Sequence, residues 1–181
     1  MVDDLISRIG RGESDFPDAD LRGADLHRAV VVGIGLDRAR LSGADLDDAH
    51  MRGTSLVGAD LTGIVARRVG WQDARLDEAR FDGSELRRCD LAGASAARVS
   101  MRKVQVTGGE WDRISAPDAD FTEATLDSVI FHHARLPAAI FRGAVLRKCS
   151  FDYADLSGAD FTGAVIEDCD FTNAIGAPTA Q

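Results

Sequence analysis

Apolar residues recur at every fifth position along most of the chain. From Phe16 to Phe171 all 32 of these positions are apolar, although only 45% of the residues are hydrophobic. The residue two places before each apolar centre is Ala in most copies and otherwise Ser, Thr, Cys, Gly, Val or Ile. Residues 154–163, with the sequence ADLSGADFTG, hold two copies of this unit end to end. A fixed short period predicts a repeat architecture in which each unit buries its centre by stacking on its neighbours.

Residues 1–13 stand outside this period and predict a short capping helix. Asp3 or Asp4 is a suitable N-cap, Leu5 and Ile9 recur at helical spacing with Ile6, and glycines follow at positions 10 and 12. A stack of strands presents an open edge that pairs readily with other chains. We therefore expect this helix to cover the first repeat.

Residues 14–175 resemble the pentapeptide-repeat family, whose unit is a small residue, Asp or Asn, Leu or Phe, and two polar residues. The best copies are 19–23, 24–26, 44–46, 59–63 and 159–163. The resemblance implies an all-β fold, a right-handed four-sided parallel β-helix in which four units form one coil. About eight coils, roughly 4.8 Å apart, would make a rod roughly 38 Å long. Residues 176–181 are then a C-terminal tail.

The fifth place of many units is Gly, which suits a corner where φ is positive. The glycines concerned are Gly23, Gly43, Gly63, Gly83, Gly143 and Gly163.

If four units make a coil, residues twenty apart share one face. The centres of one face, named here the tryptophan face, are Val31, Met51, Trp71, Leu91, Trp111, Phe131, Phe151 and Phe171. The opposite face, the phenylalanine face, has the centres Leu21, Leu41, Leu61, Phe81, Met101, Phe121, Phe141 and Phe161. Inward aromatic ladders predict core packing and not a ligand groove. The bulk of the two tryptophans is expected to be offset by small centres at Ala66 and Ala116.

The three cysteines, Cys89, Cys149 and Cys169, all occupy the small inward position of the tryptophan face. We expect them to pack as small apolar groups. The distance between adjacent coils would permit a disulfide between Cys149 and Cys169, but parallel side chains on one ladder rarely present the necessary dihedral angle.

Other candidate chemistry is weak. Gly33-Ile34-Gly35 is not followed by a helix, so it does not predict a phosphate loop. His132 and His133 are expected at a solvated corner, too far from other histidines to hold a metal. With the inward positions occupied by core, the sequence predicts no substrate pocket, no catalysis and no cofactor.

Composition narrows the possible partners. The 181 residues carry a net charge of −9, which argues against direct binding to nucleic acid or an anionic membrane. An apolar run of about 18 residues and a basic secretory start are both missing, and three cysteines fit a reducing compartment. We expect a soluble, cytoplasmic protein.

The negative charge is concentrated on two adjoining faces. The outward positions of the tryptophan face carry six carboxylates and two arginines. The adjoining face, named here the second acidic face, has its centres from Phe16 to Leu156, and its outward positions carry seven carboxylates and four arginines. Soluble rods are often acidic for solubility alone. The alternative is mimicry of a DNA duplex, of which eleven base pairs would carry roughly 22 charges. The candidate partner-binding carboxylates are Asp73, Asp77, Glu78, Glu110, Asp112, Asp118, Asp152, Asp155 and Asp170.

The family resemblance implies which proteins a DNA mimic of this kind would bind. Some pentapeptide-repeat proteins resemble DNA, bind DNA gyrase or topoisomerase IV, and protect bacteria from quinolones or other topoisomerase poisons. Here the register is not interrupted by loops as it is in the plasmid-borne resistance branch, and residues 176–181 are too short for the helical dimer module of the mycobacterial branch. A rigid scaffold for another protein partner is the second hypothesis.

The last coil predicts self-association. Its edge around Phe161, Ile166 and Phe171 is expected to be uncovered, so two copies would meet there as a symmetric homodimer.

Overall fold

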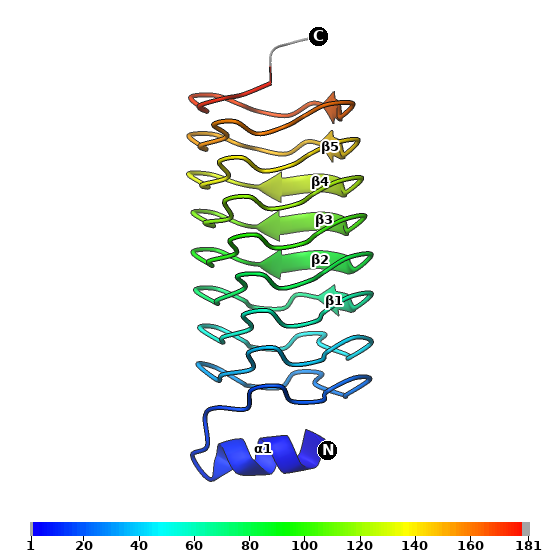
Figure 1. Ribbon diagram of the computed structural model, residues 1–181, viewed down its shortest axis with the longest axis vertical. Coiled ribbons are helices and arrows are strands. Elements are labelled where there is room, and N and C mark those ends of the chain that lie inside the picture. Colours follow the sequence, from blue (N-terminus) through cyan, green and yellow to red (C-terminus); the bar gives the residue numbers. More distant parts are fainter. Residues whose placement is uncertain (1, 179–181) are drawn as a thin grey trace.

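A computed structural model describes residues 2–178, with side chains from residue 5 onward. Helix α1 (Val2–Gly10) is followed by a stack of coils that carries one six-stranded parallel sheet (Figure 1). The strands follow one another in chain order: β1 (Val65–Arg67), β2 (Glu85–Asp90), β3 (Gln105–Glu110), β4 (Thr125–Ile130), β5 (Val145–Arg147) and β6 (Val165–Glu167).

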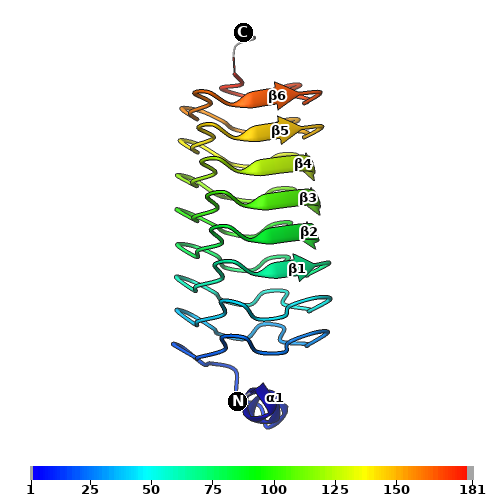
Figure 2. The same cartoon turned by 90° about the vertical axis from the view of Figure 1, so that its right-hand side faces the viewer.

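Each strand pairs with the strand twenty residues further on. Val65 lies opposite Glu85, and Val145 lies opposite Val165. Single bridges continue this step on the other faces, from Asp15 with Gly35 to Asp155 with Ile175. Figure 2 shows the strands rising as one ladder in a right-handed stack. The predicted parallel β-helix with one short helix is therefore confirmed.

The regular strands extend over fewer coils than the eight predicted. They all run along one face, named here the strand face, whose centres run from Leu26 to Ile166, and they span the five steps from β1 to β6. The longer strands β2, β3 and β4 continue around the corner onto the tryptophan face. At the position of Val65, the two earlier coils carry Asp25 and Asp45. These carboxylates accept hydrogen bonds from backbone N–H groups two residues on, which favours turns over strands, whereas β-branched residues favour strands.

The corners of the coils all use a left-handed residue at the fifth place of the unit. The predicted positive φ is confirmed at glycines such as Gly23 (62°) and Gly163 (70°). Twenty residues other than Gly, from Asp18 (59°) to Asn173 (57°), adopt the same conformation. At most corners the carbonyl of the centre accepts a hydrogen bond from the N–H three residues later, as Leu21 does from Ala24 at 3.1 Å. This is the geometry of a type II turn, which the stack imposes on residues that do not favour it.

The centres form a buried interior column. Trp71 and Trp111 are fully buried, so the prediction of core packing is confirmed. In the upper half of the stack, Phe121, Phe141 and Phe161 are stacked with ring centroids 4.9 Å apart, and Phe131, Phe151 and Phe171 form a second stack at 4.8 and 5.0 Å. Neighbouring coils thus bury flat rings at the spacing that the backbone ladder sets.

Trp111 requires a residue without a Cβ at position 109, which was not expected from the sequence. Ala66 and Ala116 are fully buried, as expected for small neighbours of the tryptophans. In addition, a Cβ on Gly109 would lie 2.8 Å from the indole Nε1 of Trp111. The sequence does indicate this requirement, because Gly109 is the one Gly at the small inward positions of the tryptophan face.

Helix α1 packs on the first coil. Leu5 is buried, Ile9 packs against the core, and the Arg8 guanidinium lies 4.7 Å from the ring centroid of Phe16. Ile6 is 40% exposed, so only two of the three expected apolar residues face the coil. The Asp3 and Asp4 side chains, expected to cap the helix, lie outside the described residues.

Candidate partner-binding faces

The aspartate that precedes a centre closes its own turn. Asp90 accepts a hydrogen bond from the N–H of Ala92 at 2.9 Å, and Asp170 accepts one from Thr172 at 2.9 Å. The same bond is formed by Asp25, Asp45, Asp60, Asp120, Asp155 and Asp160. The frequent Asp of the repeat therefore satisfies a backbone donor.

Four of the aspartates that directly follow a centre tie their coil to the next one. Asp77 accepts hydrogen bonds from the N–H of Ala97 at 2.8 Å and from the hydroxyl of Ser95 at 2.9 Å. Asp37, Asp47 and Asp82 accept the equivalent N–H twenty residues further on. These carboxylates therefore help to hold neighbouring coils together.

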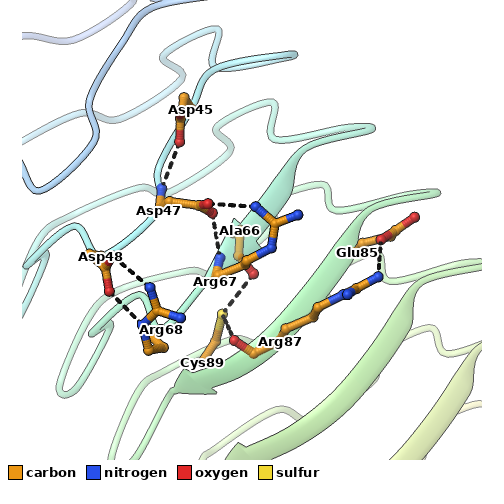
Figure 3. A network of polar contacts seen from close by, with 9 residues as sticks. All are labelled: Asp45, Asp47, Asp48, Ala66, Arg67, Arg68, Glu85, Arg87 and Cys89. Atoms are coloured by element: carbon orange, nitrogen blue, oxygen red, sulfur yellow. Dashed lines mark hydrogen bonds and ion pairs between the residues drawn. The ribbon is translucent and has the colours of Figure 1, made fainter.

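Ion pairs between coils neutralise much of the remaining charge. Figure 3 shows Asp47 with Arg67 at 2.7 Å and Asp48 with Arg68 at 2.6 Å, each pair twenty residues apart. Exposed pairs of this kind contribute little to stability, because water screens them. They do, however, decide where net charge remains on the surface.

The pairing is uneven between the faces. On the phenylalanine and strand faces, nine of fourteen carboxylates lie within 4 Å of an Arg or Lys. On the tryptophan and second acidic faces, only three of thirteen do. The two acidic faces therefore keep most of their negative charge.

The nine candidate carboxylates fall into three groups. Asp73 and Glu78 are paired with Arg52 at 2.9 Å and Arg98 at 2.6 Å. Asp77, Asp155 and Asp170 accept backbone N–H groups. The remaining four, which carry neither an Arg or Lys pair nor a backbone bond within the described residues, are Glu110, Asp112, Asp118 and Asp152.

Hydrogen bonds keep the structural carboxylates ionised. The hydroxyl and N–H of Thr162 and the guanidinium of Arg142 lower the pKa of Asp160 to about 2. The pKa values of Asp155 and Asp170 are lowered in the same way by Ser157 and Thr172. These groups are fully charged at neutral pH.

The histidine pair lies at a corner of the stack, as expected, and makes contacts there that were not expected. His132 is half-buried, its Nε2 lies 2.8 Å from Ser150 Oγ, and its Nδ1 lies 3.8 Å from Asp112 Oδ1. His133 is exposed and stacks on Tyr153 with centroids 5.1 Å apart. Over residues 2–178 no group of three His, Cys, Asp or Glu side chains is placed to hold a metal ion.

Two hollows in the surface of the described residues lie away from the nine candidates. One, of about 280 Å³, lies between helix α1 and the first coil beside Leu5 and Phe16. The other, of about 420 Å³, is an open groove beside Gly43, Gly63 and Arg67. The candidates thus form an outer surface and not an enclosed site.

The last coil is less covered than the coils below it. The centres Phe161, Ile166 and Phe171 are half-buried, whereas the Phe141 and Phe151 side chains are fully buried. Ile175, which follows them, is 63% exposed.

The architecture defines a class of protein: a solenoid whose coils repeat every twenty residues around an apolar column. The model of the family described as Pentapeptide repeats matches the chain with eight copies over residues 36–65, 72–108, 115–143 and 139–175. The chain belongs to this family.

The chain is also similar to solved structures at low sequence identity. HetL, a pentapeptide repeat protein involved in heterocyst differentiation regulation from the cyanobacterium Nostoc sp. strain PCC 7120, is 19% identical over 98% of both chains, with a TM-score of 0.34. Full-length QnrB1, a plasmid-mediated fluoroquinolone resistance protein, is 20% identical over 91% of this chain and 88% of its own, with a TM-score of 0.37. Rfr23 from the cyanobacterium Cyanothece 51142 is 18% identical over 67% of this chain and 90% of its own, with a TM-score of 0.25. No curated protein matches the chain.

No helix between residues 2 and 178 is long and apolar enough to cross a membrane.

Proposed function

We propose that the protein is a non-enzymatic, cytoplasmic DNA mimic that binds DNA gyrase or topoisomerase IV and protects against topoisomerase poisons such as fluoroquinolones. The observation that carries the proposal is the uneven pairing of charge: three of thirteen carboxylates are paired on the two acidic faces, against nine of fourteen on the other two. A partner with a basic cleft would meet these two adjoining faces first.

Charge alone does not give a complete mimic. A rod roughly 38 Å long matches about eleven base pairs, which carry roughly 22 charges. The whole chain has a net charge of −9. The rigid rod shape therefore supplies part of the complementarity, and binding should weaken as the salt concentration rises.

The test is a gyrase supercoiling assay, with and without a fluoroquinolone, on native protein and on charge-reversed variants. The informative variant is Glu110→Lys with Asp152→Lys, because neither carboxylate is paired with an Arg or Lys or holds a backbone N–H in the part of the chain described. Asp77, Asp155 and Asp170 are unsuitable, since reversing them would also remove backbone hydrogen bonds.

The matched control reverses two carboxylates of the strand face, Asp127→Lys with Asp168→Lys, and so changes the net charge equally. We expect native protein and control to inhibit gyrase or protect it from the drug, and the Glu110 and Asp152 variant to lose this effect while keeping its circular dichroism spectrum. Equal activity of both variants would rule out recognition through the acidic faces.

A rigid protein-interaction scaffold is the second candidate function. It is favoured by the structural roles of Asp77, Asp155 and Asp170, because an acidic surface arises here partly from the needs of the backbone. If native protein at micromolar concentration has no effect on gyrase or topoisomerase IV, this function is preferred. Affinity capture with native protein and the Glu110 and Asp152 variant would then identify partners that depend on the acidic faces.

We also propose that the protein is a homodimer joined through the last coil. The half-buried centres Phe161, Ile166 and Phe171 support this assembly, since a second copy would complete their burial.

A further inference from the structure

Two of the three cysteines are neighbours in the stack. Cys149 and Cys169 occupy the same position in adjacent coils, and the register is fixed by a hydrogen bond from the N–H of Asp170 to the carbonyl of Cys149 at 2.9 Å. Adjacent coils lie about 4.8 Å apart. This is within the roughly 4.4–6.8 Å range of Cα separations found in disulfides. All three cysteines are free thiols in the structure.

The two thiols have different surroundings. Cys149 is buried, and its Sγ lies 3.4 Å from the carbonyl oxygens of both Leu126 and Arg147. Cys169 is half-buried in the last coil, with its Sγ 3.4 Å from the carbonyl oxygen of Glu167. Only Cys169 is therefore open to a reagent from solvent.

The pKa values of the two neighbouring thiols are shifted in opposite directions. The neighbouring Cys149 side chain lowers the pKa of Cys169 to about 7, although burial opposes this shift. The same contact, together with burial, raises the pKa of Cys149. The exposed thiol is thus the one that ionises near neutral pH, and the thiolate is the nucleophilic form.

We propose that Cys169 and Cys149 form a thiol–disulfide exchange site, in which Cys169 reacts first with a low-molecular-weight disulfide and Cys149 completes a bond between the last two coils. In the first step the Cys169 thiolate attacks one sulfur of the small disulfide and expels one thiolate, leaving a mixed disulfide. In the second step Cys149 loses its proton and attacks the Cys169 sulfur, expelling the second thiolate. Two protein thiols are oxidised and one small disulfide is reduced to two thiols.

The position of the pair makes this closure feasible. Parallel side chains of two fully stacked coils are poorly oriented for a disulfide. The coil of Cys169, however, contacts a neighbouring coil on one side only within the described residues, and its centres Phe161 and Phe171 are less buried than those below. A coil held on one side opens at a lower free energy than a coil held on both sides. The inference does not depend on topoisomerase binding.

Cys89 provides an internal control. It occupies the same ladder, and its Sγ lies 3.4 Å from the carbonyl oxygen of Ala66 and 3.7 Å from that of Arg87 (Figure 3). Its ladder neighbours are Val69 and Gly109, so it has no adjacent thiol. Burial raises its pKa to about 11.

The test treats the reduced, dilute full chain with glutathione disulfide at neutral pH and follows the intact mass. We expect native protein and Cys89→Ser to lose two hydrogens, with peptide mapping joining Cys149 to Cys169. Cys149→Ser should stop with one glutathionyl group on Cys169, and Cys169→Ser should not react. Ser fits the inward position, because the hydroxyl of Ser84 is buried at the equivalent place and donates to the carbonyl of Leu61 at 2.9 Å.

The pH dependence separates a tuned thiol from an ordinary exposed one. The alkylation rate of Cys169 should rise with an inflection near pH 7, below the value of about 8.5 for a free cysteine. A stable mixed disulfide in native protein, equal reactivity of Cys89, or an inflection at the ordinary value would each overturn the proposal.

Discussion

At the scale of single residues, the corners of the coils carry the clearest conflict between local preference and fold. A left-handed conformation costs a residue other than Gly about 1–2 kcal/mol. Ala138 and Gly158 occupy the same corner in neighbouring coils, with φ of 57° and 71°. Both are exposed, and a Cβ on Gly158 would meet nothing within 4 Å. The two sites therefore isolate the backbone contribution from packing.

We predict that Ala138→Gly raises the free energy of unfolding by about 0.5–1 kcal/mol and that Gly158→Ala lowers it by a similar amount. The gain at Ala138 is smaller than the strain because Gly makes the unfolded chain more flexible. Denaturant unfolding of the two variants beside native protein measures both effects. Changes of the same sign at the two corners would contradict the argument.

Gly109 is a residue whose role depends on one neighbour. We predict that Gly109→Ala lowers the free energy of unfolding by about 1–3 kcal/mol, because its Cβ would lie 2.8 Å from Nε1 of Trp111, whose side chain is fully buried. Adding Trp111→Phe should make the Gly109→Ala cost much smaller, so the two changes would not be additive. Denaturant unfolding of the four-member cycle measures this, and strict additivity would show that the indole is not the obstacle.

At the scale of the repeat unit, aspartates stabilise turns and link neighbouring coils through hydrogen bonds and ion pairs, which lower their pKa values. Asp160 has its pKa lowered to about 2, first by the hydroxyl and N–H of Thr162 and then by Arg142. Asp20 has its pKa lowered to about 2, first by the side chain of Arg22. Because the folded-state pKa is below that of an unfolded Asp, about 3.9, each carboxylate stabilises the fold above that value. The contribution is lost as the pH falls from about 4 to about 2.

We predict that Asp160→Asn weakens the fall in melting temperature between pH 4 and pH 2, because the amide is neutral throughout. Asp20→Asn tests the same effect at the other end of the stack, independently of Asp160. Melting curves by circular dichroism across this pH range measure both. An acid dependence of both variants equal to that of native protein would show that these carboxylates are not linked to folding.

The unit scale also shows what the sequence could and could not predict. The five-residue period predicted a stack of repeats with buried centres, since the apolar side chains must avoid water, and the family resemblance implied the four-sided β-helix. The glycine corners followed from the freedom of Gly to adopt a positive φ. It did not reveal that Asp77 holds Ala97 and Ser95, and counting charges per face placed Asp77 in the partner-binding set. A signal was present in the spacing of eighteen residues between Asp and Ser, as in Asp37 with Ser55 and Asp82 with Ser100. Ion pairing between coils escaped prediction because long side chains at exposed positions have several partners within reach.

At the scale of the whole molecule, the end of the stack decides how long the acidic surface is. Phe161 and Phe171 end two continuous phenylalanine stacks, and both are half-buried. Burying such apolar area contributes about 25 cal/mol per Å². A symmetric contact between two last coils would cover these rings and extend the rod to roughly 76 Å, the length of about 22 base pairs.

We predict that native protein sediments as a dimer at high micromolar concentration and that Ile166→Asp sediments as a monomer, because a charge at this centre opposes burial against a second copy. Val165→Asp is the control for added charge in the same coil, since Val165 points outward and is already 46% exposed. It should remain dimeric, and both variants should keep the native circular dichroism spectrum. A monomeric native protein at this concentration would exclude the assembly, and the acidic faces would then act over the length of a single rod.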